Sequence, residues 1–75
     1  MRLMDAPQNK WLSVSALDGG ARMTARLSQH GLFIGDRLRV LRMAPLNGPL
    51  LIEVNGREIA LGRGIAEKIL VEVGE

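Results

Sequence analysis

Residues 27–40 of this 75-residue chain read Leu27-Ser28-Gln29-His30-Gly31-Leu32-Phe33-Ile34-Gly35-Asp36-Arg37-Leu38-Arg39-Val40. Met23 lies four positions before Leu27, so the two side chains share one side of a short helix, predicted over about residues 21–30. Gly31 follows directly, where a left-handed residue ends a helix. Gly35 permits a tight turn before residues 37–43, a run typical of a strand. The stretch therefore predicts one short helix set among β-strands.

The rest of the chain predicts further strands joined by tight turns. Residues 11–16 alternate between apolar and serine side chains, as a half-buried strand does. Pro45–Pro49, with Asn47-Gly48 inside it, and Asn55-Gly56 are hairpin turns. They join strands over residues 37–43, 50–54 and 57–61, and the last short strand covers residues 70–73. The apolar phase slips near Leu41, which predicts a bulge, and residues 63–68 predict a helical turn.

These elements predict a mainly β fold of about five strands, bent into a small barrel that hides its strand edges. A chain of 75 residues makes one domain, and we expect it to span residues 11–75. Residues 1–10 show no period and read as a flexible N-terminal arm. Without cysteine, and without an apolar run of the roughly 18–20 residues that a membrane span needs, the chain is expected in the cytoplasm.

The charge balance gives only a weak indication of a partner. Ten basic residues face eight acidic ones, for a net charge of +2. Small basic barrels do bind RNA or single strands through a basic groove and stacked aromatics. Here Trp11 and Phe33 are the two aromatic residues, and Phe33 follows the helix end, where packing in the core is the simpler role. Nucleic acid is therefore not the expected partner.

The residue inventory offers no catalytic or metal-binding set. With one histidine, no cysteine and no tyrosine, Cys/His nucleophilic pairs are excluded, and no serine lies in a nucleophile elbow. His30 has no second histidine three or four positions away, so a metal ion would need ligands borrowed from a neighbouring copy. No cofactor motif is present, because no Gly-Lys-Ser/Thr follows the glycines. The sequence predicts a binding protein and not an enzyme.

The order of small motifs resembles the FeoA family, small cytosolic accessory proteins of ferrous iron transport. The motifs that carry the resemblance cover roughly residues 11–73. They are Leu17 with Gly19-Gly20, Arg26-Leu27, Gly31-Leu32, Gly35-Asp36, Val40, Pro45 to Pro49, Leu50 to Val54, Gly56 to Leu61, Ala66 and Ile69 to Val71. Ile34 departs from the family, which often has proline before this glycine. The resemblance implies an SH3-like barrel with one inserted helix, no enzymatic activity, and a partner in the cytoplasmic GTP-binding part of the membrane ferrous iron permease FeoB.

Two candidate contact sites follow for such a partner. The exposed side of the predicted helix carries Arg22 and Arg26 at i and i+4, with His30 beside them. Like charges at this spacing repel by a few tenths of a kcal/mol, so their presence suggests a basic contact patch, with a solvated surface as the simpler interpretation. The alternative site is a cleft between helix and barrel. Its lining is drawn from Met23, Leu27, Leu32 and Phe33, for which core packing is the default.

Two other function classes stay open at this point. The first is a small basic barrel that binds RNA or single-stranded nucleic acid through Arg37, Arg39, Arg42 and Arg57. Steep salt dependence would identify it, because phosphate contacts weaken as salt rises. The second is a structural subunit that only self-associates. Weak homo-oligomers through exposed strand edges are compatible with every interpretation.

Overall fold

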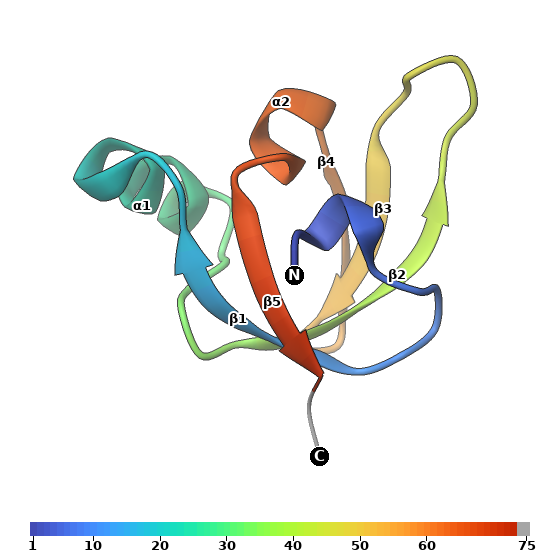
Figure 1. Ribbon diagram of the computed structural model, residues 1–75, viewed down its shortest axis with the longest axis horizontal. Coiled ribbons are helices and arrows are strands. Elements are labelled where there is room, and N and C mark those ends of the chain that lie inside the picture. The colour runs from blue at the N-terminus through green and yellow to red at the C-terminus, as the bar shows by residue number, and fades with distance from the viewer. Residues whose placement is uncertain (74–75) are drawn as a thin grey trace.

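The computed structural model describes residues 1–73. Its elements along the chain are the 3₁₀ turn η1 (Leu3–Asp5), β1 (Leu12–Leu17), α1 (Gly20–Gln29), β2 (Arg37–Met43), β3 (Leu50–Val54), β4 (Arg57–Leu61), α2 (Arg63–Ala66) and β5 (Ile69–Val73). Figure 1 shows the strands wrapped around a common interior, with α1 on one side and the β2–β3 hairpin projecting on the other. The predicted mainly β fold, its short helix and the helical turn near residues 63–68 are confirmed.

The five strands form one antiparallel sheet in the order β4-β3-β2-β1-β5. The register between β2 and β3 shifts between Val40 and Arg42, which confirms the bulge predicted near Leu41. A second shift, between Val14 and Ala16 in the β1–β5 pair, was not predicted and leaves Ala16 only half-buried. Such bulges sharpen the bend of a strand, so a sheet this small curls over its own apolar face.

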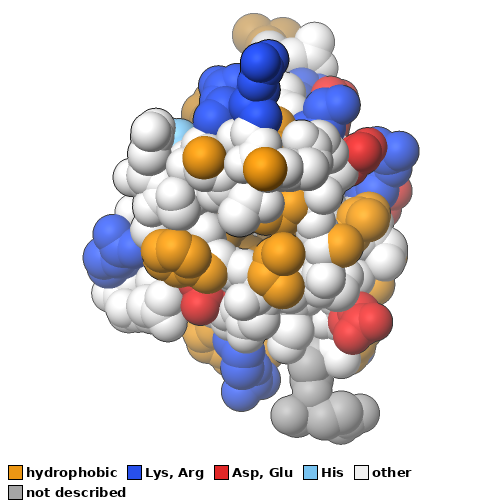
Figure 2. Space-filling view, turned by 90° about the vertical axis from the view of Figure 1, so that its left-hand side faces the viewer, with side chains coloured by type: hydrophobic (Ala, Val, Ile, Leu, Met, Phe, Trp, Pro, Cys, Tyr) orange, Lys and Arg blue, Asp and Glu red, His pale blue; other side chains and the backbone are white. Residues whose placement is uncertain are grey.

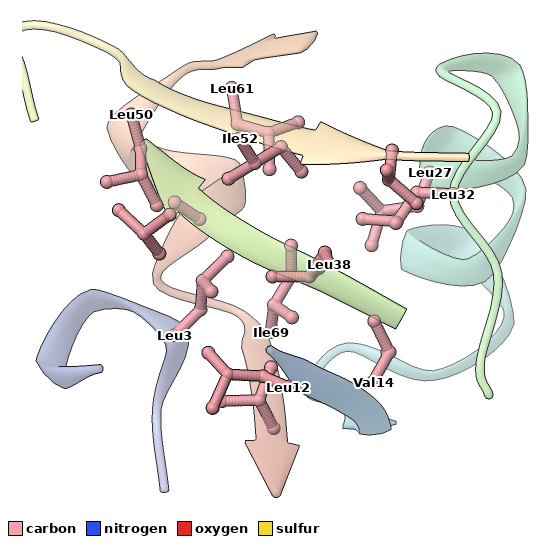
Figure 3. Close-up of a cluster of buried hydrophobic side chains, with 14 of the residues drawn as sticks. Leu3, Leu12, Val14, Leu27, Leu32, Leu38, Leu50, Ile52, Leu61 and Ile69 are labelled. Carbon is pink, nitrogen blue, oxygen red and sulfur yellow. The ribbon is translucent and has the colours of Figure 1, made fainter. Parts of the chain in front are cut away.

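The core collects apolar side chains from every strand and from α1, as Figure 3 shows. Its members are Leu3, Leu12, Val14, Met23, Leu27, Leu32, Leu38, Val40, Leu50, Ile52, Val54, Leu61, Ala66, Ile69 and Val71. No polar or charged side chain is buried among the described residues. The fold is therefore held mainly by removal of aliphatic surface from water, with backbone hydrogen bonds satisfied in the sheet.

Residues 1–10, which the sequence predicts as a flexible arm, pack against the curled sheet in this structure. The backbone N–H of Val71 donates to Met1 O at 2.7 Å, along the side of β5 that faces away from β1. Leu3 in η1 is 1% exposed and lies in the core. The backbone N–H of Asn9 donates to Val40 O at 2.8 Å, at the bulge in β2. Residues 1–10 show no apolar periodicity, but they still supply the Leu3 side chain to the core. A single buried side chain leaves no periodic pattern in the sequence.

The ends of α1 follow one predicted signal and depart from another. Gly31 has φ +82° just after the helix, as expected for a left-handed C-terminal residue. Asp18, of a residue type that commonly caps helices, does not cap α1: the N-cap is Gly19, with φ +121° and no side-chain cap bond. Instead the Asp18 N–H donates to Lys68 O at 2.7 Å. The start of α1 is thus set by two glycines and by contact with the chain before β5.

The two hairpin turns differ in how well the sequence located them. Asn55 and Gly56 have φ +52° and +76°, the pair of left-handed residues that a two-residue hairpin requires. In the β2–β3 hairpin the left-handed pair is Leu46 and Asn47, at φ +58° and +61°, one residue before the predicted Asn47-Gly48. Glycine is required at position 48 for a steric reason, because a Cβ there would lie 2.7 Å from Ala44 Cβ.

Gly31→Ala and Gly35→Ala are each expected to cost about 1–2 kcal/mol of unfolding free energy, because alanine is strained at φ +82° and +93°. Only at Gly31 would the new Cβ also meet the Arg57 guanidinium; nothing lies within 4 Å of a Cβ at Gly35. In an Arg57→Ala background the cost of Gly31→Ala should therefore fall while that of Gly35→Ala stays. Urea denaturation of the single and double variants measures both costs. Equal costs of Gly31→Ala in the two backgrounds would contradict the contact.

Candidate functional site

One side of α1 carries the three residues that the sequence analysis selected. Arg22, Arg26 and His30 follow each other at four-residue spacing, and all three are exposed. Met23 and Leu27, one position further along, are 9% and 0% exposed and face the core. Neighbouring positions of an α-helix are turned by about 100°, so Arg22, Arg26 and His30 flank the buried stripe and stay exposed. We call the exposed set Arg22, Arg26 and His30 the α1 basic face.

The charge of the α1 basic face is not neutralised by an ion pair within residues 1–73. Across residues 1–73 the ion pair formed is Arg39 with Glu53, so neither Arg22 nor Arg26 has an acidic partner there. The first turn of α1 contains no acidic residue, and Arg22 lies near the positive end of the helix dipole. An opposite charge from outside would therefore be attracted to this face, and Arg22 gains no stabilisation from the helix dipole at this end of α1.

Two exposed apolar side chains follow the helix on the same side of the molecule. Phe33 and Ile34 are 52% and 56% exposed, in the turn between Gly31 and β2. The turn is fixed by two bonds: the Phe33 N–H donates to Asp36 Oδ2 and the Asp36 N–H donates to Phe33 O, both at 3.0 Å. Figure 2 views this side and shows several exposed apolar side chains, with Lys and Arg side chains and some Asp and Glu side chains around them. The prediction of a core role for Phe33 is wrong, because the turn directs its side chain outward.

The predicted cleft between helix and barrel is filled. Met23, Leu27 and Leu32 all belong to the buried core. No pocket opens in the part of the chain that the structure describes. The structure therefore separates the four residues that the sequence grouped: three hold α1 against the sheet, and Phe33 joins the surface beside the α1 basic face.

A cluster around Trp11 was missed in the sequence. The guanidinium carbons of Arg37 and Arg39 lie 5.7 and 5.1 Å from the centre of the Trp11 ring, within range of cation–π attraction. Arg39 Nε also donates to Glu53 Oε1 at 2.7 Å. The strand register brings these side chains together. Leu12 pairs with Leu38, so Trp11 lies opposite Arg39 on the outer face of the sheet. Trp11 therefore lies beside two arginines on the surface of the sheet.

No group of three or more His, Cys, Asp or Glu side chains that could hold a metal ion occurs within residues 1–73. His30 stands at the C-cap of α1, where its backbone N–H donates to Leu27 O at 2.9 Å. Among the described helices, none has the length and hydropathy needed to cross a membrane.

The fold and these exposed surfaces define a small β-domain, in which residues 1–73 form no internal pocket. The family is then given by the sequence itself, because the model of the FeoA domain matches residues 1–73. The chain belongs to the FeoA family. It is accordingly a small accessory protein of iron transport and not an enzyme.

Individual relatives agree with this assignment. The chain is 40% identical over 70 residues to a protein of Methanocaldococcus jannaschii named as an Fe(2+) transport protein A, covering 93% of this chain and 83% of the relative. The crystal structure of an iron uptake regulatory protein, FeoA, is 29% identical with a TM-score of 0.84, covering 96% and 95% of the two chains. The FeoA protein of Chlorobium tepidum is 32% identical with a TM-score of 0.82, covering 97% and 70%.

The same fold occurs inside a larger protein. ScaR, crystallised with bound Zn2+, matches 99% of this chain at 26% identity and a TM-score of 0.87, but the match spans only 37% of ScaR. The SH3-like fold that the resemblance implied is confirmed by the solved FeoA structures.

Proposed function

We propose that this protein supports ferrous iron uptake by binding the cytoplasmic GTP-binding region of a FeoB-type permease. The α1 basic face, with the adjacent Phe33 and Ile34, is the contact surface. In this proposal the protein is cytoplasmic and reaches the membrane only through its partner. Family membership supports the transport role, and the exposed surfaces support a protein partner.

The observation that carries the proposal is the combination of uncompensated charge with exposed apolar area. Arg22 and Arg26 have no acidic partner within residues 1–73, and Phe33 and Ile34, which follow the C-terminal end of α1, are more than half exposed. Protein interfaces typically combine apolar or aromatic anchors with a polar rim. Charged rims mainly accelerate association and select the partner. The partner surface should accordingly be acidic around an apolar centre.

Direct binding tests the proposal. The purified chain is titrated into the purified GTP-binding region of the permease from the same organism, without nucleotide, with GDP and with a GTP analogue, in a calorimeter. Saturable one-to-one binding in at least one nucleotide state is expected. Absence of saturable binding in all three states, and to the full-length permease in detergent, would contradict it.

The Trp11 cluster is the one observation that favours the nucleic-acid alternative, because an aromatic ring among arginines is what a stacked base uses. Against it, Glu53 already holds Arg39 in an ion pair. Trp11 is the only tryptophan in the chain, so its fluorescence reports on this cluster alone. We expect the emission to stay unchanged when a single-stranded oligonucleotide is added at low salt. Quenching that disappears at moderate salt would instead support nucleic-acid binding.

A further inference from the structure

The two edge strands of the sheet differ in what lies on their outer sides. The start of the chain runs along β5, where the Val71 N–H donates to Met1 O at 2.7 Å. On the outer side of β4, residues 1–73 form no backbone hydrogen bond and no β-bridge. Proline, lysine, bulges or covering segments commonly protect such an edge from pairing. β4 contains neither proline nor lysine and pairs with β3 without a register shift, so its outer edge is regular and open.

Two residues of β4 direct their backbone groups away from the sheet. Because Asn55-Gly56 is a two-residue turn, the residues that flank it, Val54 and Arg57, are a hydrogen-bonded pair. Inward and outward positions alternate along a strand, so the N–H and C=O groups of Glu58 and Ala60 point outward. Both residues are exposed. Their four backbone groups can therefore bond to another extended strand.

A second copy of β4 can use these groups in three antiparallel registers, and the charges distinguish them. Pairing Glu58 with Glu58 of the second copy sets two carboxylates opposite each other, which is destabilising. Pairing Ala60 with Ala60 of the second copy brings Arg57 toward Arg63, again two like charges. Pairing Glu58 with Ala60 avoids both contacts and brings the two copies of Ile59 together. Ile59 is only partly buried against its own core, so this register also removes apolar surface from water.

We propose that two copies of this chain form a dimer by antiparallel pairing of their β4 strands, with Glu58 of each copy opposite Ala60 of the other. The two-fold symmetry uses both open edges, so assembly stops at two copies. A second copy fits this edge better than a disordered peptide does, because β4 is already held extended by β3 and loses little entropy on pairing.

We expect the dimer to be reversible. Two five-residue strands make a small contact, whereas stable interfaces bury roughly 1,200–2,000 Å². The dimer should therefore dissociate at micromolar or higher concentrations. It goes beyond the proposed function and needs no permease, so sedimentation velocity of the purified chain, from low micromolar to near-millimolar concentration, measures it.

Ala60→Pro tests the strand pairing. It removes the outward N–H from both copies, and the dissociation constant of the dimer should rise roughly 10- to 100-fold. Proline is tolerated on an edge strand where the N–H faces away from the sheet, so the variant should keep the wild-type circular dichroism spectrum.

Ala60→Lys and Ala60→Glu test the register. Position 60 faces Glu58 of the other copy at two symmetric places, so lysine should tighten the dimer roughly threefold or more and glutamate should weaken it by a similar factor. Overall charge acts in the opposite direction, because lysine raises the net charge of +2 and glutamate lowers it. Ala60 is exposed, so both variants should fold.

The outcomes decide between this contact and others. Wild-type dimers that Ala60→Lys strengthens and Ala60→Glu weakens support the pairing, and this comparison suffices if Ala60→Pro fails to fold. A wild-type chain that stays monomeric at near-millimolar concentration overturns it. Dimers that all three folded variants leave unchanged lie on another surface and also overturn it. Equal weakening by lysine and glutamate overturns the register of Glu58 with Ala60.

Discussion

Leu3→Ala is expected to lower the free energy of unfolding by about 2–5 kcal/mol, the range for leucine-to-alanine changes in well-packed cores. Leu3 is 1% exposed and packs in the core from a segment that precedes the first strand. A domain of this size loses about 4–8 °C of Tm per kcal/mol, so Tm should fall by about 10 °C or more. Thermal unfolding followed by circular dichroism gives the value.

The matched control for this prediction is Leu46→Ala. It makes the same chemical change at a side chain that is 98% exposed, so it should alter the unfolding free energy by no more than about 0.5 kcal/mol. A Leu3→Ala variant as stable as Leu46→Ala would mean that residues 1–10 do not close the core in solution. The flexible arm of the sequence analysis would then be the better description.

Arg22→Glu/Arg26→Glu is expected to slow association with the permease's GTP-binding region by roughly tenfold or more at low salt. Reversal of two charges turns attraction into repulsion, and charges on an interface rim act mainly on the association rate. The difference from the wild type should shrink as salt is raised, because exposed charges are screened beyond about 10 Å at 0.1 M. Stopped-flow or biolayer kinetics at several salt concentrations measure it.

Lys10→Glu/Lys68→Glu is the control for the charge reversal. It changes the net charge by the same amount at two exposed residues outside α1. If the control slows association as much as Arg22→Glu/Arg26→Glu does, the effect belongs to overall charge and the α1 basic face is not the contact. Both double variants should keep the wild-type circular dichroism spectrum, since all four side chains are exposed.

Local signals predicted most of the elements because they depend on a few neighbouring residues. Gly31 and Gly35 take the positive φ angles expected of them, and Asn55 with Gly56 forms the predicted turn. The helix Gly20–Gln29 lies one residue from its predicted bounds. Alternation in residues 11–16 marks the buried side of β1, where Leu12 and Val14 are buried, up to the register shift before Ala16. Backbone sterics and the side-chain period are properties of short segments, so they can be predicted from a few neighbouring residues of the sequence.

The candidate site was predicted only in part. Exposure of Arg22 and Arg26 followed from the helical period, since Met23 and Leu27 define the buried side. Phe33 was misplaced because its direction depends on a turn closed by the Asp36 side chain, and hydrophobicity does not encode that direction. The sequence also did not predict that Leu46 and Asn47 are the left-handed pair of the β2–β3 turn. The usual Asn-Gly pattern lies one residue later, at Asn47-Gly48.

By itself, the sequence determined the strands, the short helix, the turns and the absence of a catalytic residue set, along with the family resemblance. Only the tertiary structure decided that residues 1–10 supply Leu3 to the core, that Trp11 meets Arg37 and Arg39, and that Phe33 and Leu46 face outward. The physical reason is the range of the interactions. Secondary structure arises from neighbours in the chain, whereas burial and side-chain contacts depend on which distant segments the curled sheet brings together.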